Sequence, residues 1–481
     1  MSCQLKNTDD VFNVNKNILA SNELENYNNN DNLLDLQPKV FNTCEININD
    51  KLQSAEAELQ PEENKLQSVI ELPELSKNNS KVPDVLQVQR ENVHISDTKL
   101  SQENHNTVPE TLDSDTITEI INYYDWSKTP RLLCSVAEEP PTDLENLTRG
   151  CIWSPDGTCL LVPSADFRIR VYELPRELYT GTLPETLPLP LLTPALKIKE
   201  GGLVYDTCWY PWMSSWEPDT CCFLSTSKET PVHLWDAFTG SLRATYRAYN
   251  QVDEVEAAIS VQFAESGSSI WTGFDNALRS FDTNRPGRQI NDVLLKNDFP
   301  NVRGIVSCIR DNPAMPGLIA FGTYSKCIGL YKDGPLCVLK TDSGVTQIEF
   351  SACGTKLYSA VRRSNELICW DLRNPGIILK SFEKRQADTN QRIQFCLSND
   401  GNQIISGSTD GEVKVWSLEN STETEVSPSW SIKLSNDCIN GVNAHKTLPI
   451  LSTCSGQRFH DDDICKDNSV RFWYCGPDDT A

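Results

Sequence analysis

The chain has 481 residues, with 67 Asp and Glu against 43 Lys and Arg, and a formal net charge of −24 at pH 7. So acidic a chain is a poor candidate for a general nucleic-acid coat, because non-specific binding needs positive charge spread over the surface. No apolar run is long enough to span a membrane, so we expect no membrane association.

Residues 1–120 are predicted to form a disordered tail. The segment is acidic and rich in Asn, most densely at residues 26–32, and it has few aromatic side chains. It cannot bury enough apolar surface to offset the entropy lost on ordering. We therefore predict an acidic, Asn-rich tail, followed by a folded domain over residues 121–478.

A three-strand pattern is clearest at Arg392–Glu419. Three alternating runs are separated by turns at Asn399–Gly401 and at Asp410-Gly411. Asn-Gly and Asp-Gly pairs tolerate positive φ and suit the twist of antiparallel hairpins. The third run ends in Trp416, which is typical of a WD40-type blade.

A similar closing strand, ended by an aromatic residue, occurs seven times. The closing aromatics are Tyr172, Trp235, Phe281, Tyr331, Trp370, Trp416 and Trp473. Their shorter steps lie near the roughly 40–45-residue WD40 period, and the longer steps leave room for loop insertions, including an aromatic excursion at Trp212–Trp216. The pattern predicts an all-β, seven-bladed WD40 β-propeller. An irregular β-sandwich is the alternative, but sandwiches do not repeat such a strand seven times.

The two ends of the folded region are expected to meet. The chain ends soon after Val470–Cys475, which is a third strand with no fourth strand behind it. Propellers avoid open sheet edges by closing their ring, and an N-terminal strand commonly completes the last blade. We predict that the strand at residues 131–136 closes the seventh blade.

Sorting the loops by side of the propeller predicts one basic rim. This rim holds the segments leading into the innermost strands and the turns between second and third strands. Its basic and aromatic residues are Arg149, Tyr205, Lys228, Tyr249, Arg303, Tyr324, Lys326, Arg362, Arg363, Arg392 and Arg458. The opposite rim carries Asp156, Asp219, Asp236, Glu265, Asp311, Asp333, Asp371 and Asp400, together with Arg285, Arg288 and Arg373.

The basic rim is the candidate RNA-binding surface. Arg side chains contact phosphates, and Tyr rings stack on unpaired bases. The alternative is that these residues only balance neighbouring acidic side chains.

No catalytic constellation is found. The chain has no P-loop, GxSxG or HExxH motif, and its five His residues are scattered. The 18 Cys residues form no CxxC pair, and many lie in β-runs, where thiols behave as small buried hydrophobes. We expect no enzyme activity, no cofactor and no metal site.

A second motif leaves another function open. The pattern Trp370-Asp371-Leu372-Arg373 resembles the WDxR sequence by which some WD40 proteins dock as substrate receptors of cullin ubiquitin ligases. Ordinary blade-end packing is the simpler explanation of these four residues.

Several stretches resemble the telomerase Cajal body protein family. They are Tyr123–Trp126, Arg149–Gly157, Val204–Tyr210, Trp235–Ala244, Arg247–Asn250, Arg285–Arg288, Thr389–Ile393 and Ser455–Arg458. The resemblance covers about residues 123–475. That family binds the CAB box, a short loop element of small Cajal-body RNAs of the box H/ACA class, and of telomerase RNA in some lineages. It delivers these particles to Cajal bodies.

The resemblance also implies partners and a location. The partners would be small Cajal-body RNAs, box H/ACA particle proteins, the telomerase particle where present, coilin and the SMN complex, and a chaperonin during folding. The location would be the nucleus and its Cajal bodies, with some protein in the cytoplasm. The long acidic and Pro-rich flanks of the family are matched only in part.

Overall fold

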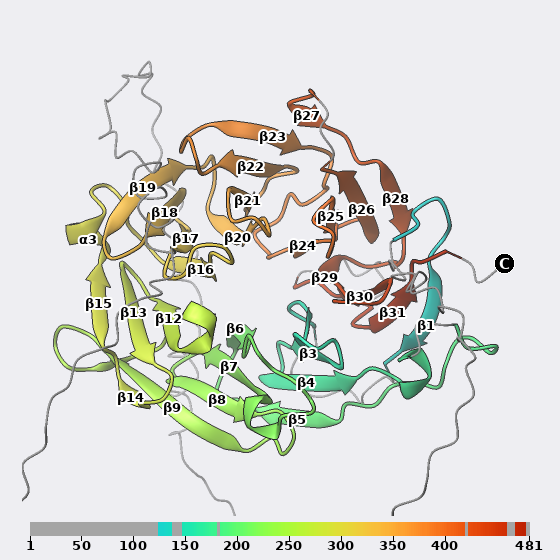
Figure 1. Cartoon of the computed structure of the whole chain (residues 1–481), viewed down its shortest axis with the longest axis horizontal. Coiled ribbons are helices and arrows are strands. Elements are labelled where there is room, and N and C mark those ends of the chain that lie inside the picture. The colour runs from blue at the N-terminus through green and yellow to red at the C-terminus, as the bar shows by residue number, and fades with distance from the viewer. Residues whose placement is uncertain (1–123, 137–146, 180–182, 419–421, 459–466, 478–481) are drawn as a thin grey trace, which may run out of the picture. The chain divides into compact units, whose positions relative to one another are not determined.

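The structure is a computed structural model that describes residues 124–136, 147–179, 183–418, 422–458 and 467–477. The predicted tail lies outside the described residues. The described part is nearly all β, with seven sheets arranged in a ring, which confirms the predicted seven-bladed WD40 β-propeller (Figure 1).

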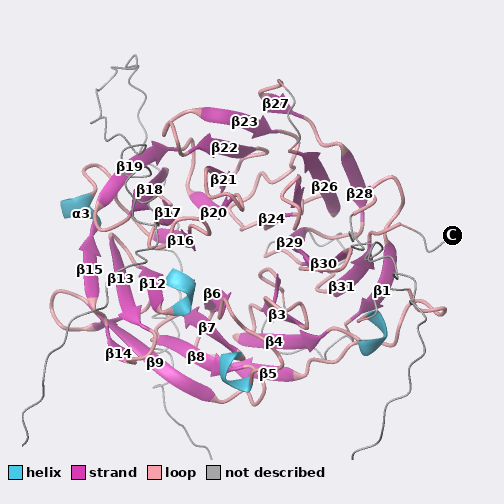
Figure 2. Ribbon diagram, in the orientation of Figure 1, coloured by secondary structure: helices cyan, strands magenta, loops and turns pink. Residues whose placement is uncertain are grey.

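In the part of the chain that the structure describes, helical structure is limited to short turns (Figure 2). In the described residues these are η2 (Arg176–Leu178), η3 (Pro218–Thr220), η4 (Glu265–Gly267) and α3 (Leu295–Asp298). None of the described helices is long and apolar enough to cross a membrane.

The first three blades each run from an innermost to an outermost strand. Blade 1 comprises β2 (Ile152–Trp153), β3 (Cys159–Pro163), β4 (Arg168–Glu173) and β5 (Leu196–Lys199). Blade 2 comprises β6 (Val204–Trp209), β7 (Cys222–Ser227), β8 (Val232–Asp236), β9 (Leu242–Tyr249) and β10 (Val255–Glu256). Blade 3 comprises β11 (Ser260–Ala264), β12 (Ser269–Gly273), β13 (Ala277–Asp282) and β15 (Asn291–Leu294), while β14 (Gly287–Arg288) pairs with β9 of blade 2.

The next three blades have the same order. Blade 4 comprises β16 (Val306–Asp311), β17 (Ile319–Thr323), β18 (Cys327–Tyr331) and β19 (Pro335–Lys340). Blade 5 comprises β20 (Val345–Phe350), β21 (Lys356–Val361), β22 (Leu367–Asp371), β23 (Ile378–Phe382) and the added β27 (Glu425–Val426). Blade 6 comprises β24 (Phe395–Leu397), β25 (Gln403–Ser406), β26 (Glu412–Ser417) and β28 (Trp430–Lys433).

Blade 7 joins the two ends of the folded region. It comprises β29 (Ile439–Ala444), β30 (Ile450–Ser455), β31 (Val470–Tyr474) and, as its outermost strand, β1 (Arg131–Ser135). β1 runs antiparallel to β31, with Arg131 opposite Tyr474. On the other side of β1, the Leu189 amide donates to the Leu133 carbonyl at 2.7 Å. Both edges of β1 are therefore hydrogen-bonded, which leaves no open sheet edge at the closure.

The closing aromatics all lie in the third strand of their blades. Trp416 is fully buried, and its indole N–H donates to the Glu383 carbonyl at 3.1 Å. Trp370 donates to the Ser359 hydroxyl at 2.8 Å. A large ring that packs between sheets while its polar edge stays hydrogen-bonded explains why this position recurs.

Candidate nucleic-acid interface

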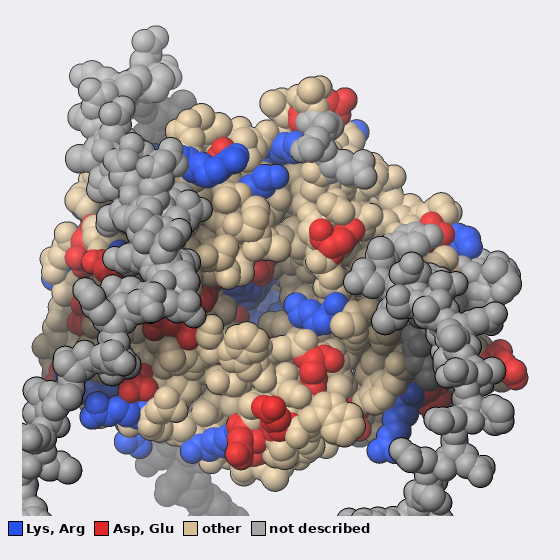
Figure 3. Space-filling model, viewed as in Figure 1, with Lys and Arg blue, Asp and Glu red and all other residues tan. Residues whose placement is uncertain are grey.

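The ring of blades is hollowed at its centre, and we call this hollow the central channel (Figure 3). Five side chains of the basic rim lie at one mouth of this channel. Arg149 precedes β2, Arg392 precedes β24, Arg458 follows β30, Tyr324 follows β17 and Arg362 follows β21. We call these five residues the central basic cluster. Arg458, Arg392 and Tyr324 are all close enough to Arg149 to influence its ionisation, and the Arg362 guanidinium lies 3.5 Å from the centre of the Tyr324 ring.

Arg149 is the most unusual member of the cluster. Burial lowers the pKa of its guanidinium, and the cations of Arg458 and Arg392 lower it further. Its Nη1 is buried without a hydrogen-bond acceptor among the described residues, and so is Nε of Arg362. An unpaired buried donor typically costs about 1–3 kcal/mol. An anionic ligand at the channel mouth would remove that cost.

The backbone around the cluster is held firmly. The Arg149 amide donates to the Pro163 carbonyl at 2.9 Å, and the Arg362 amide donates to the Gly344 carbonyl at 2.8 Å. Gln391 donates its Nε2 to the Gly456 carbonyl at 3.0 Å. The backbone that carries the two unpaired donors is thus held in place by the fold.

Carboxylates lie deeper in the channel. Nη1 of Arg392 is 3.4 Å from Oδ1 of Asp206, and Arg310 pairs with Glu349 at 2.8 Å. These carboxylates stand on the innermost strands β6 and β20, so the order of the loops does not reveal them. The sequence could have indicated such a carboxylate by a charged residue within a mostly apolar inner strand, as Asp206 is in Val204–Trp209.

Tyr205 and Lys228 extend the cluster towards blade 2. Burial raises the pKa of Tyr205, while the neighbouring Lys228 and Arg149 oppose that shift. Arg303, Lys326 and Arg363 are exposed instead, and Lys326 and Arg363 occupy turns with φ of 65° and 51°. Their exposure distinguishes these three side chains from the half-buried Arg149 and Arg362.

The neighbour of Tyr249 corrects a prediction. Arg288 was expected on the opposite rim, but its guanidinium lies 4.5 Å from the centre of the Tyr249 ring. The connection between β13 and β15 does not end in a tight turn. It runs along the outer edge of blade 2, where β14 pairs in parallel with β9. One face of the Tyr249 ring is therefore covered.

The acids of the opposite rim mostly cap turns. Oδ2 of Asp156 accepts from the Ser215 amide at 2.7 Å, and Oδ1 accepts from the Ser154 hydroxyl at 2.6 Å. Burial alone would raise the pKa of Asp156, but these hydrogen bonds bring it below its usual value. Figure 3 shows the face that carries η3 and η4, with acidic side chains gathered over β5 and β8.

The WDxR residues make internal contacts of this kind. Trp370 is buried and bonded to Ser359. Asp371 accepts from Nε of Arg373 at 3.0 Å, and this bond lowers the pKa of Asp371. Blade-end packing thus accounts for the motif.

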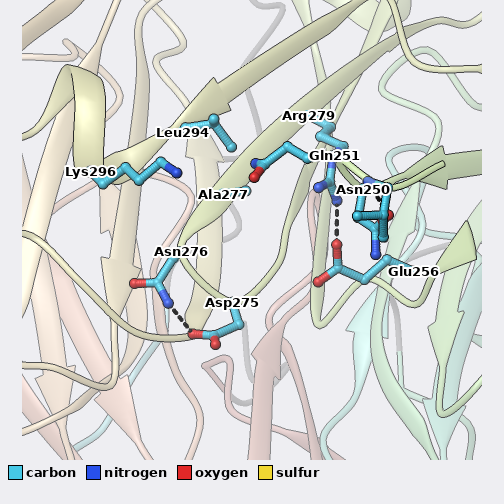
Figure 4. A pocket seen from close by; sticks show the side chains of 10 residues that line it. Asn250, Gln251, Glu256, Asp275, Asn276, Ala277, Arg279, Leu294 and Lys296 are labelled. Carbon is cyan, nitrogen blue, oxygen red and sulfur yellow. Dashed lines mark hydrogen bonds and ion pairs between the residues drawn. The ribbon is translucent and has the colours of Figure 1, made fainter. Parts of the chain in front are cut away.

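A pocket of about 320 Å³ opens between blades 2 and 3 (Figure 4). Its walls include Asn250, Asn276, Lys296 and Glu256, and Oε2 of Glu256 lies 2.8 Å from Nη1 of the buried Arg279. No Ser, Cys or His is among the residues that line this pocket. In the described residues, no three His, Cys, Asp or Glu side chains gather as metal ligands.

Comparison with known proteins supports the resemblance. A family model described as "WD domain, G-beta repeat" matches residues 386–417, which contain β24, β25 and β26. Telomerase Cajal body protein 1 of Mus musculus is 44% identical over 344 residues, covering 70% of this chain and 63% of the mouse protein. The chain is a homologue of telomerase Cajal body protein 1.

Other relatives agree. The Homo sapiens telomerase Cajal body protein 1 is 43% identical over 343 residues, which cover 70% of this chain and 61% of the human protein. The Drosophila melanogaster homolog is 41% identical over 330 residues, which cover 66% and 58% of the two chains. The chain therefore spans less than two thirds of the length of these relatives.

Three of the stretches that resemble telomerase Cajal body proteins come together at the cluster. Arg149–Gly157, Thr389–Ile393 and Ser455–Arg458 each contribute one of its arginines. The Arg458 amide donates to Oε1 of Gln391 at 3.3 Å, which ties the last two stretches together.

Proposed function

We propose that this chain binds a single-stranded RNA loop at the central basic cluster and serves, without catalysis, as a scaffold for RNA particles of the nuclear Cajal body. The observation that carries the proposal is Arg149, whose buried Nη1 has no acceptor among the described residues and whose neighbours are Arg392 and Arg458. Guanidinium groups match phosphate oxygens in charge and geometry.

Several features favour an unpaired loop over a duplex. Tyr205 and Tyr324 offer rings for base stacking beside the cations, which is how single-stranded RNA is commonly recognised. The net charge of −24 restricts favourable contact with RNA to this local site. A short, exposed loop can enter the channel mouth without bringing a helix against the acidic surface.

The resemblance to the telomerase Cajal body protein family suggests which RNA to propose. The ligand would be the CAB-box loop of box H/ACA RNAs, and of telomerase RNA where one exists. Binding that loop while engaging Cajal-body proteins would deliver the particle. The box H/ACA proteins, coilin and the SMN complex are the proposed partners.

Crosslinking followed by RNA sequencing tests the proposal. We expect the tagged wild-type chain to enrich small RNAs that share one loop motif. The double variant Arg149→Gln/Arg458→Gln should lose this enrichment, whereas Arg176→Gln/Arg285→Gln, with the same change in charge on exposed arginines, should keep it. Co-purification of a cullin adaptor without RNA would contradict the proposal and support the ubiquitin-ligase alternative.

A further inference from the structure

The rim opposite the cluster presents large aromatic side chains to solvent. Trp216 is 93% exposed and Trp212 is 63% exposed, and both lie in the loop between β6 and β7. Phe238, in the turn between β8 and β9, is 55% exposed. We call residues 211–220 the tryptophan loop. The two loops are neighbours, because Arg243 contacts both Asp219 and Asp236. Large exposed aromatic side chains on adjacent loops suit an interaction site.

The tryptophan loop is held by three blades. Ser215 donates its amide and its hydroxyl to Oδ2 of Asp156 in blade 1, both at 2.7 Å. Arg243 of blade 2 donates to the Asp219 carbonyl at 2.6 Å. Nε1 of Trp212 donates to the Ser266 carbonyl of blade 3 at 3.0 Å. The backbone that carries the rings is therefore already ordered, which lowers the entropic cost of binding a partner.

The charge around the tryptophan loop is acidic. Glu217 and Asp219 lie within the loop and are exposed, and Glu265 is exposed beside Ser266. The nearby cation Arg243 is occupied, because it pairs with Asp236 at 2.8 Å as well as with the loop carbonyls. The surface therefore combines exposed aromatic rings with exposed carboxylates. Residues 211–220, all of which the structure describes, contain no arginine that could neutralise these carboxylates.

We propose that the tryptophan loop binds a cationic segment of a partner protein, with an Arg or Lys side chain over the Trp216 ring and paired with Glu217 or Asp219. Indole is the best aromatic partner for a cation, and carboxylates nearby select a positively charged peptide. RNA is disfavoured here by the same carboxylates. Residues 1–123 of this chain also fit poorly, because they carry 22 Asp and Glu against 9 Lys and Arg.

The two rims would then have separate ligands. The central basic cluster would hold RNA while the tryptophan loop holds a basic protein segment, so one chain could join the two. This inference does not depend on RNA binding, since the loop lies on the other rim and shares no residue with the cluster.

A labelled synthetic peptide of alternating Arg and Gly tests the inference by fluorescence anisotropy with the full chain. We expect binding that Trp216→Ala weakens about 5- to 30-fold, the range of a cation–π contact. Ile378→Ala is the matched control, because Ile378 is 51% exposed but lies on blade 5. Circular dichroism should show the same fold for both variants, since both side chains face solvent.

The acidic contribution has its own control. Glu217→Gln/Asp219→Asn should weaken peptide binding, whereas Glu423→Gln/Glu425→Gln, with the same change in net charge elsewhere, should not. Equal affinity of Trp216→Ala and wild type, or equal binding of a Glu-Gly peptide, would overturn the inference. A dimer in sedimentation equilibrium that Trp216→Ala dissolves would also overturn it, because the loop would then bind a second copy of the chain.

Discussion

The two rims of the propeller use charge in different ways. On one rim, Arg149 and Arg362 present buried nitrogens that have no acceptor among the described residues. On the other rim, Asp156 is satisfied by serine donors, and Asp371 is satisfied by Arg373. The unpaired guanidinium nitrogens cost stability and remain free to bind a ligand. The hydrogen-bonded carboxylates stabilise turns instead.

This difference teaches how to weigh charged residues. A count of acids and bases makes the two rims look like simple opposites. Hydrogen bonding shows that several carboxylates of the acidic rim hold its own loops, and its exposed binding surface is aromatic as well as acidic. The basic rim keeps guanidinium donors available for a ligand.

The largest expected effect comes from opening the ring of blades, which would disrupt both rims. Deleting the chain through Val136 takes away β1, so β31 loses its outer partner and blade 7 is left with an open edge. We expect aggregation and loss of a cooperative melting transition, measured by light scattering and circular dichroism. Deletion of residues 1–120 is the control and should leave the melting transition unchanged. If the two truncations behave alike, β1 does not close the ring.

Arg149→Met should separate function from stability. Removing one charged hydrogen-bonding group should weaken RNA binding about 10- to 150-fold. The same change removes an unpaired buried donor, so the free energy of unfolding should rise by about 1 kcal/mol in urea titrations.

Arg170→Met is the matched control for a buried arginine. Arg170 pairs with Asp166 at 2.7 Å, and both side chains are almost fully buried. Removing it leaves the buried Asp166 carboxylate with Arg168, at 3.0 Å, as its remaining cationic partner, and should cost up to about 3–5 kcal/mol. Destabilisation by Arg149→Met of similar size would mean that Arg149 is structural.

Acid should lower the free energy of unfolding through His445, which lies on the rim that carries the tryptophan loop. His445 is buried, with Nε2 at 2.8 Å from the Gly157 carbonyl and Nδ1 accepting from the Leu448 amide at 3.0 Å, as in a neutral ring. Burial lowers its pKa from 6.5 to about 4. The unfolded chain therefore binds the proton more tightly, so the stability that His445 contributes is complete above pH 6.5 and is lost as pH falls towards 4.

The size of the acid effect is bounded. The pKa shift of His445 corresponds to at most about 3 kcal/mol of unfolding free energy. Asp311 acts in the opposite sense, because burial raises its pKa to about 6. Comparing melting temperatures of wild type and His445→Gln across this range isolates the histidine. The melting temperature of the variant should fall less steeply than that of the wild type as pH decreases from 6.5 to 4. Equal steepness in the two proteins would contradict the role given to His445.

The smallest expected effect concerns the salt dependence of RNA binding. Arg362→Glu/Arg363→Glu should reduce the slope of log K against log salt by roughly 0.7 for each phosphate that the variant no longer neutralises. Arg176→Glu/Arg285→Glu, on the opposite rim, is the control, because Arg288 proved to lie against Tyr249. A control pair that abolishes binding while the first pair leaves it intact would place the RNA on the other rim.

Much of the fold was predictable because its information is local and repeated. Trp416 and the six other closing aromatics mark third strands, and Asn-Gly or Asp-Gly turns such as Asp410-Gly411 mark hairpins. The position of Arg288 was not predictable in this way. It depends on pairing between β14 and β9, and on Gln289, which accepts from the Tyr249 amide at 3.0 Å.

The candidate site was predictable only as a set of loops. Loop order placed Arg149, Arg392 and Arg458 on one rim, but it could not show that these three converge while Arg303 and Lys326 are exposed. Convergence depends on the depth of each loop in the channel, which follows from packing. The carboxylate of Asp206 was missed for a related reason, because it stands on a strand.

Crosslinking of bound RNA to protein, with the modified residues identified by mass spectrometry, tests the central claim most directly. The full chain would be irradiated with a small RNA whose loop carries the CAB box, and with the same RNA after the loop is substituted. We predict crosslinks at Tyr205 and Tyr324 that disappear with the substituted loop. Crosslinks at Trp212 or Trp216 instead, or crosslinks that do not depend on the loop, would contradict the account.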